Sequence, residues 1–453
     1  MILLNTGENN WYTYPSLSLG YIAGALSDAG HRVIVVDLQI EDSPLIAIKK
    51  AIEEGERHLG VTVNAANVSR TAELIAQIRN LYPELKLIAG GPQASAIPGT
   101  LLECGFDAVV VGEGEPVICR IAAGEPPENI QGVFCPEKLR TASEERVPHI
   151  QDLDSVPWPA WESFQLDKYY FPGHRPAVPI TTSRGCPFNC INCTKFLHGY
   201  KVRRRSITDV VDEMENAVDR WGIREFHFWD DHFTYDTDRV CQLCEEILER
   251  NLQKKMRFAL PNGIRADVRE EEMLDMLVKA GLYAASVSVE SGSQKVVDKL
   301  GKKIDLSVVL GTVEALRERN VRVALYFMMG LPFETLDDLN ATIRMACSLP
   351  AHHAHFFIAT PFPGTRLYEL AREHGQLLRP PNELSTYDEA GPYMSSPHWT
   401  SNQLRAKRRE AFRRFYTNPQ HLLDIASALV TEPQDWGFLV QNAWRIFLTG
   451  SRV

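Results

Sequence analysis

The sequence of 453 residues has few cysteines, no long apolar run and no excess of positive charge. No stretch of about 18 or more apolar residues occurs, so we expect no membrane-spanning helix and no stable membrane insertion. The first residues, MILLNTGENN, form a very short apolar stretch without a basic lead, which predicts a cytoplasmic protein without a signal peptide. The net charge of −10 argues against a general nucleic-acid binder, because neutralising phosphates requires a basic surface.

Three of the nine cysteines are crowded into one short stretch, TTSRGCPFNCINCTKF. They are Cys186, Cys190 and Cys193. A disulfide is not expected in the cytosol and would leave one cysteine over. A structural zinc site needs four ligands, usually as two pairs, and no second pair follows at the usual spacing. Three thiolates suit an iron–sulfur cluster in which one iron keeps an open coordination position.

Outside the three-cysteine stretch, the only CxxC motif is Cys241 to Cys244, which lies inside a helical pattern. Ile247 and Leu248 continue an apolar face there, so we expect these two cysteines to pack in the core.

Strand and helix patterns alternate through residues 1–125, which predicts a doubly wound α/β domain because continuous Val and Ile runs suit strands buried on both faces. Ligands of such sheets bind beyond the carboxyl ends of the strands. The turns expected there are small, polar and rich in glycine: Asn5–Gly7, Thr62–Asn64, Gly90–Gln93 and Gly112–Glu115. A glycine that merely ends a strand explains each single turn equally well.

The rest of the chain divides into three parts. Residues 126–177 are rich in Pro, Trp and Tyr and are expected to form a linker that packs on both neighbours. Six longer strand–helix units follow over residues 178–375 and predict a full or partial β/α barrel, with its chemistry at the carboxyl ends of the strands. Residues 376–453 are expected to form a small helical region, including the basic stretch NQLRAKRREAFRRFY.

The cysteine spacing after a first barrel strand resembles the radical S-adenosylmethionine (SAM) superfamily, and residues 1–125 resemble a cobalamin-binding domain. An aromatic residue usually precedes the third cysteine in that superfamily, and this chain has Asn192 there. The resemblance implies a Rossmann-like cobalamin-binding domain followed by a partial, TIM-like radical SAM barrel. The motifs that carry it are LGYIAGALSDAGHRVIVVD, GGPQAS and VVVGEGE in the first part, and FHFWDDHFTYD, NGIRAD, VSVESGS, GLPFET and ATPFPGTRLYE in the second.

The resemblance also implies the cofactor residues. The three cysteines would hold a 4Fe-4S cluster whose open iron binds SAM. The residues implied in SAM binding are Phe188, Asp230, Asp231, Arg265, Ser288, Glu290, Met328, Gly330 and Glu334. Of these, Asp230 and Asp231 match the element that meets the amino group of SAM, Arg265 and Ser288 point to its carboxylate or ribose, and Glu290 to its ribose.

Cobalamin would lie along the glycine-rich turns of the first domain. The residues implied are Asn5, Thr6, Gly7, Trp11, Tyr12, Thr62, Val63, Asn64, Gly90, Gly91, Gln93, Gly112, Glu113, Gly114 and Glu115. Many cobalamin modules carry a cobalt-binding histidine after the first strand, but residues 3–20 contain none. We therefore expect cobalt without a histidine ligand from this loop, with aromatic residues such as Trp11, Tyr12 and Tyr14 covering its lower face.

The function implied is that of a cobalamin-dependent radical SAM methyltransferase. It would transfer methyl from methylcobalamin to an unactivated carbon of a small molecule or natural product, after hydrogen abstraction by a 5′-deoxyadenosyl radical. An external one-electron reductant of the flavodoxin or ferredoxin type is implied as a partner. No catalytic residue toward the substrate is identified; Tyr393, His398 and Trp399 are candidates for substrate contact, although a packed loop explains them as well.

Other activities are possible on the same scaffold, and the sequence favours each of them either as much as methyl transfer or less. A rearrangement, cyclisation or oxidation without methyl transfer stays open, because fold does not determine reaction. A methylthiotransferase usually carries extra N-terminal cysteines, and residues 1–103 have none. A cobalamin or redox sensor is disfavoured, because the sequence shows no DNA-binding motif and a sensor has no need of a three-cysteine loop.

Overall fold

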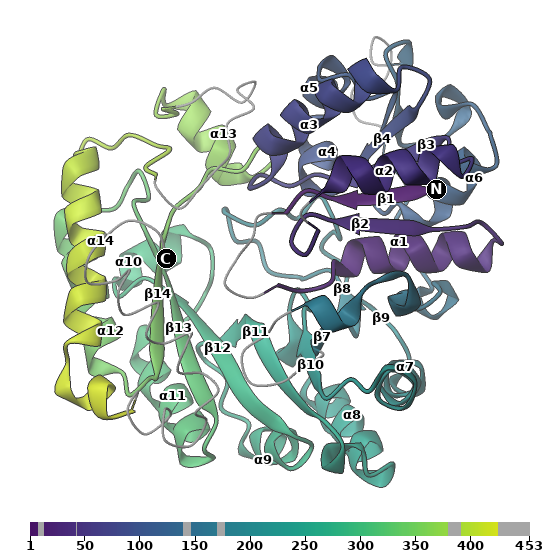
Figure 1. The fold of residues 1–453 in the computed structure, drawn as a ribbon. Helices are drawn as coiled ribbons and strands as arrows, with labels where there is room; N and C mark the ends of the chain where they lie inside the picture. Colours follow the sequence, from purple (N-terminus) through teal and green to yellow (C-terminus); the bar gives the residue numbers. More distant parts are fainter. Residues whose placement is uncertain (8–12, 42, 139–145, 170–176, 379–390, 425–453) are drawn as a thin grey trace.

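The protein is built on two six-stranded sheets (Figure 1), and its largest apolar core contains residues of both sheets. The computed structural model describes residues 1–453 except 8–12, 42, 139–145, 170–176, 379–390 and 425–453. The predicted Trp11 and Tyr12 therefore lie outside the described residues.

The first sheet has the strand order β2-β1-β3-β4-β5-β6, with β1 to β5 parallel and β6 antiparallel at one edge. Alternate residues of β1 enter different cores, Leu3 on one face and Ile2 and Leu4 on the other. Both faces are therefore buried, as the continuous apolar runs predict. Its strands are β1 (Ile2–Asn5), β2 (Ile34–Asp37), β3 (His58–Thr62), β4 (Lys86–Gly90), β5 (Ala108–Val110) and β6 (Val133–Phe134). Its helices are α1 (Leu17–Asp28), α2 (Pro44–Glu53), α3 (Val68–Leu81), α4 (Pro92–Ala96), α5 (Pro98–Glu103) and α6 (Glu115–Ala122).

The second sheet is entirely parallel and follows the chain order, which is the arrangement of a barrel that does not close. The α/β class, with a doubly wound first part and a partial barrel second, is confirmed. Its strands are β7 (Ala177–Ile180), β10 (Glu225–Phe228), β11 (Arg257–Arg265), β12 (Leu282–Glu290), β13 (Arg322–Met329) and β14 (His353–Ile358). The helices of this part are α7 (Ile207–Trp221), α8 (Thr237–Glu249), α9 (Glu271–Lys279), α10 (Gln294–Lys299), α11 (Val309–Glu318), α12 (Leu336–Ser348) and α13 (Arg366–Glu373).

The connection between the sheets is bound to both of them. Strand β6 belongs to the first sheet, which thus extends beyond residue 125. The backbone N–H of Ala160 donates to the carbonyl of Gly20 on α1, at 3.1 Å. The indole N–H of Trp158 donates to Asp209 on α7, at 2.8 Å. This segment therefore fixes the first sheet's helix α1 close to the barrel.

Helix α14 (Ser401–Tyr416) packs on α12 and on the edge strand β14 (Figure 1). Its Arg408 is only 8% exposed and donates from Nε to the carbonyl of Phe356 at 2.8 Å. The hydroxyl of Tyr416 lies 3.4 Å from the backbone N–H of Ala354. Basic side chains of this helix are thus used in packing as well as at the surface. Among the described residues, none of the helices is both long and apolar enough to span a membrane.

Candidate functional site

The cysteine stretch is a long loop closed at its base by a two-stranded stem. Strand β8 (Ser183–Arg184) pairs antiparallel with β9 (Arg203–Arg204), so residues 185–202 form the loop. At the first loop position, Gly185 has φ +99°, and a Cβ atom there would lie 2.3 Å from the carbonyl oxygen of Lys201. Only glycine fits this turn, which explains the Gly before the first cysteine.

The three loop cysteines are free thiols that are open to ligands. Cys186 and Cys190 are half-buried and Cys193 is exposed, and all nine cysteines of the chain are free. A hydrogen bond from the Cys193 thiol lowers the pKa of Cys190 to about 6. The same bond raises the pKa of Cys193. A thiol that ionises readily is suited to bind metal, because the thiolate is the metal ligand.

The sulfur atoms do not converge on one ion. Within the described residues, no three His, Cys, Asp or Glu side chains are close enough together to hold a single metal ion. Zinc is therefore a poor fit for this loop. A cluster, in which separate irons each take one thiolate, fits three thiols that are near neighbours without a common centre.

Two acidic residues after β10, Asp230 and Asp231, accept hydrogen bonds from residues at or just before the start of the cysteine loop. Asp230 is 3% exposed and accepts hydrogen bonds from the hydroxyls of Thr182 and Ser183, each at 2.7 Å. Burial raises the pKa of Asp230, and these hydrogen bonds offset only part of that effect. Asp230 thus fixes the chain just before the loop, and a role toward the amino group of SAM stays a prediction.

Its neighbour Asp231 is more open, with 38% of the side chain exposed. It accepts from the backbone N–H of Gly185 at 2.7 Å and lies 2.9 Å from Nδ1 of His198, within the loop. Burial opposes ionisation, but the contacts with His198 and Gly185 outweigh it, so the pKa of Asp231 is lowered. Of the two carboxylates, Asp231 is the one that can also reach a ligand.

An aromatic stack lies beside the loop. The ring of Phe188 is stacked on His232, with centroids 5.3 Å apart, and the guanidinium of Arg265 lies 4.2 Å from the centre of the Phe188 ring. Arg265 itself forms a two-pronged ion pair with Asp267. Nε2 of His232 is buried and has no hydrogen-bond partner among the described residues, and burial lowers the pKa of this histidine to about 4. A buried polar atom of this kind usually has a partner, so the stack offers one free hydrogen-bonding position to a ligand.

The ends of β12 and β13 complete the surroundings of the loop. Glu290 has φ +71°, which is strained for a non-glycine residue, and is paired with Lys302. Lys302 in turn helps to lower the pKa of Cys190. Met328 packs in the same apolar cluster as Ile191 of the loop. The structure thus brings predicted residues from separate strands to the cysteine loop.

Glu334 and Ser288 are engaged within their own strand ends. Oε2 of Glu334 accepts from the backbone N–H of Gly330 at 2.7 Å, while Oε1 is buried without a partner. Burial raises the pKa of Glu334 to about 8. Ser288 faces Gly263, where a Cβ atom would lie 2.3 Å from the serine hydroxyl. Glu334 closes the turn after β13 as a neutral acid at pH 7.

The turns of the first sheet have the shape expected of a ligand-binding edge. Gly91 has φ +98°, and a Cβ atom there would lie 2.9 Å from the carbonyl of Val63. Gly112 also has a positive φ, of +110°. The polar residues predicted in these turns bond mainly to one another or to neighbouring turns: Asn5 to Asp37, Thr6 to Thr71, Asn64 to Asn67 and Gly112 to Ser95.

The acidic turn after β5 binds arginines at the base of the cysteine loop. Glu113 lies 2.7 Å from Arg203 and 3.4 Å from Arg184, and Glu115 lies 2.6 Å from Arg184. Both glutamates were predicted to bind cobalamin; in the structure their carboxylates contact these two arginines, and a role toward cobalamin stays a prediction. Arg184 and Arg203 were not predicted as site residues, although they flank the loop in sequence.

Two family descriptions match the chain. Residues 180–346 match the radical SAM superfamily, and residues 9–122 match the B12 binding domain. The chain is a cobalamin-binding member of the radical SAM superfamily. The first match contains the cysteine loop, and the second covers most of the first sheet.

The similar proteins are of more than one kind. An uncharacterized methyltransferase of Pyrococcus horikoshii is 29% identical, over 96% of this chain and 93% of its own. An anaerobic magnesium-protoporphyrin IX monomethyl ester cyclase of Cereibacter sphaeroides is 26% identical, over 89% of this chain and 67% of its own. The fold is similar to that of the radical SAM methyltransferase TsrM from Kitasatospora setae, solved with cobalamin and a [4Fe-4S] cluster, with a TM-score of 0.70, 21% identity and coverage of 90% and 89%.

The other cysteine pair of this radical SAM protein lies inside helix α8, as predicted. Cys244 is fully buried, and burial raises its pKa to about 12. Cys241 is half-buried and packs against the same core. Neither thiol is suited to bind a metal ion.

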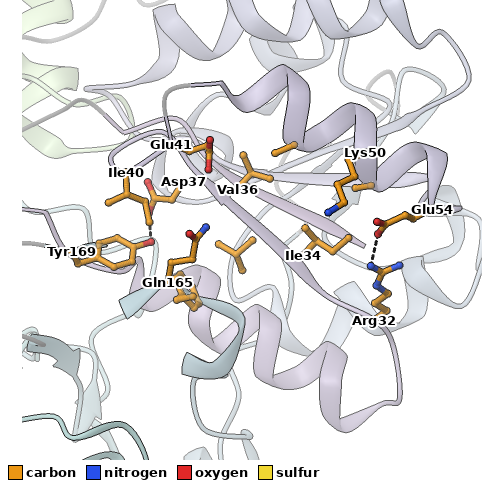
Figure 2. A pocket seen from close by; sticks show the side chains of 14 residues that line it. Arg32, Ile34, Val36, Asp37, Ile40, Glu41, Lys50, Glu54, Gln165 and Tyr169 are labelled. Carbon is orange, nitrogen blue, oxygen red and sulfur yellow. Dashed lines mark hydrogen bonds and ion pairs between the residues drawn. The ribbon is translucent and has the colours of Figure 1, made fainter. Parts of the chain in front are cut away.

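A cavity of about 280 Å³ lies beside the edge strand β2 (Figure 2). Basic, acidic and apolar side chains line it, among them Arg32, Lys50 and Phe164. At one end the hydroxyl of Tyr169 donates to Asp37 at 2.8 Å. None of the predicted site residues that the structure describes lines this cavity, and no described residue of the cysteine loop does so.

Proposed function

We propose that the protein is a cobalamin-dependent radical SAM methyltransferase that acts on an unactivated carbon of a small molecule. The observation that carries the proposal is the junction of the two sheets, where Glu113 of the B12-binding part binds Arg203 and Arg184 at the base of the cysteine loop. This contact joins the turn expected to bind cobalamin to the loop expected to bind the cluster. The methyltransferase named in Pyrococcus horikoshii is similar over nearly the whole chain, which supports methyl transfer as the reaction.

Each edge would hold its cofactors by different means. Cys186, Cys190 and Cys193 would bind a 4Fe-4S cluster, and His232 and Asp231 offer polar atoms beside it for SAM. Gly91 and Gly112 would let the backbone of the first sheet approach cobalamin closely. When bound, these groups supply one-electron cleavage of SAM and a transferable methyl group. The protein's part is to position them and to exclude water between the two sheets.

A second candidate is a ring-forming reaction without methyl transfer. The similarity to a magnesium-protoporphyrin ester cyclase favours it, since that match also extends over most of this chain. Both candidates need the cysteine loop and differ in the products formed from SAM.

The products of SAM distinguish the two. The protein would be reconstituted without oxygen, using iron, sulfide and hydroxocobalamin, and then given a chemical one-electron reductant, SAM carrying a deuterated methyl group, and a small-metabolite extract. We expect S-adenosylhomocysteine and 5′-deoxyadenosine to form in step with a deuterium-labelled product. Formation of 5′-deoxyadenosine alone would favour cyclisation or rearrangement. If the wild type forms no more of either product than Cys190→Ala, the proposal fails.

A further inference from the structure

The two ends of the cysteine loop are joined by a buried pair of arginines. Arg184 ends β8 and Arg203 begins β9, and the two are paired directly across the stem. Their side chains are 9% and 3% exposed. Two guanidinium groups at this depth need anionic partners, because an unpaired buried charge is strongly destabilising.

The partners come from the first domain. Glu113 forms a two-pronged ion pair with Arg203, with N–O distances of 2.7 Å and 2.8 Å. The same carboxylate lies 3.4 Å from Arg184, which also pairs with Glu115 and lies 5.1 Å from the centre of the Tyr21 ring on α1. The second oxygen of Glu113 accepts from the backbone N–H of Ile150 at 2.7 Å. This carboxylate is therefore fully occupied by the chain itself.

We infer that Glu113 is a positioning residue that holds both ends of the cysteine loop from within the B12-binding domain. One carboxylate contacts the residue before the loop and the residue after it, so the first domain sets the distance between the loop's ends. Glu115 strengthens the contact at one end only. The relative positions of the three cysteines then depend on Glu113, a residue that itself binds no metal. The inference rests on the proposed function in one respect only, the identity of the cofactor that the loop binds.

The turn that carries Glu113 is also one of the glycine-rich turns predicted to contact cobalamin. A ligand that orders this turn would therefore also favour the ordered loop, and a group bound by the loop would favour the ordered turn. Such coupling is reciprocal by thermodynamic necessity.

Hydrogen–deuterium exchange in the cofactor-free protein tests the positioning directly. We expect Glu113→Gln to increase backbone exchange over residues 185–202 by ~10-fold or more, since a neutral amide no longer balances two buried guanidinium groups. Glu115→Gln should give a smaller increase near residue 184 only. The matched control is Glu225→Gln, which removes an equally buried carboxylate paired with Arg257 at the opposite end of the barrel strands.

The outcomes separate positioning from general destabilisation. Unchanged exchange in Glu113→Gln, or an equal increase over residues 185–202 in Glu225→Gln, would overturn the inference. If Glu113→Gln does not fold, Glu113→Asp and Glu115→Gln carry the same test. In reconstituted protein we expect Glu113→Gln to keep its iron but to give a heterogeneous electron paramagnetic resonance signal of the reduced cluster, with Glu113→Asp restoring part of the wild-type signal. Failure to bind iron in the wild type would contradict the proposed function and leave the exchange result valid.

Discussion

The carboxyl ends of the two sheets meet in this protein, and they present different chemistry. The first sheet ends in short turns whose polar side chains bond to one another and whose glycines adopt positive φ angles, as at Gly91 and Gly112. The second sheet opens after β7 into a loop that carries three free thiols. The edge of the first sheet can therefore fit a ligand closely against its backbone, whereas the edge of the second sheet presents cysteine side chains suited to binding metal. The same parallel architecture serves both, and each edge can be changed by a substitution of its own.

The largest effect is expected at the second edge, from Cys190→Ala. With one of three thiolates missing, the loop should bind no intact cluster, and SAM cleavage should fall to background. Iron and sulfide content and visible absorbance after reconstitution measure this. Binding of hydroxocobalamin at the first edge should be retained, weakened only by the coupling through Glu113.

Cys244→Ala is the control for that variant. It removes a buried thiol of α8 and should lower stability without changing iron content, because it only removes packing. Equal loss of iron in Cys190→Ala and Cys244→Ala would show that the wrong cysteines are assigned to the metal.

A smaller, reciprocal effect is expected at the first edge, from Gly91→Ala. The added Cβ atom would lie 2.9 Å from the carbonyl of Val63, at a φ of +98°. We expect a loss of about 1–3 kcal/mol in the free energy of unfolding and weaker binding of hydroxocobalamin, with iron content retained. Chemical denaturation and cobalamin titration measure the two quantities.

Gly90→Ala, at the neighbouring position, is the control for Gly91→Ala. Among the described residues, no atom lies within 4 Å of a Cβ placed at Gly90, and the φ of Gly90 is not positive. Gly90 is itself predicted to contact cobalamin, so this variant controls for stability only, and we expect it to be nearly as stable as the wild type. An equal loss of stability in both variants would show that the positive φ of Gly91 is not what makes alanine costly there.

The smallest expected effect concerns the pKa of a buried carboxylate, which is shifted in opposite directions at the two edges. Glu113 has its pKa lowered, because its arginine partners outweigh the cost of burial, whereas the pKa of Glu334 is raised to about 8. The unfolded chain releases the Glu334 proton near pH 4.3, so the contribution of this residue to stability is present below that pH and is lost as pH rises toward 8. Between pH 6 and pH 7 the loss should be about 1.4 kcal/mol.

Glu334→Gln should remove this part of the decline, measured by denaturation at the two pH values. Glu373→Gln, an exposed carboxylate on α13, is the control and should follow the wild type. A decline that persists in Glu334→Gln would mean that Glu334 is ionised in the folded protein.

The strands and the α/β class could be predicted from sequence because most strands are compact apolar runs, each followed by its own turn. Strand β6 could not, since Val133 and Phe134 are two residues whose strand state depends on pairing with β5. The three cysteines were predictable as one site because they are close in sequence. The acidic turn was identified as part of a site, but its partners were not.

The reason is that Glu113 and Arg203 are 90 residues apart and meet only through tertiary structure. An acidic, glycine-rich turn has the same sequence pattern whether it faces a ligand or an arginine. The buried arginines on each side of the cysteines were the available signal. A long basic side chain next to a metal-binding loop needs a counter-charge, and the VGEGE turn is a source of one.

The helix laid along β14 has a consequence for how the protein behaves at high concentration. A barrel that stops at six strands has two outer strands, and one of them, β14, carries backbone groups that could pair with a strand of another molecule. Arg408 and Tyr416 occupy part of that hydrogen-bonding edge, through Phe356 and Ala354. Helix α14 therefore covers part of the β14 edge, which leaves fewer of its backbone groups free to pair with a strand of another molecule.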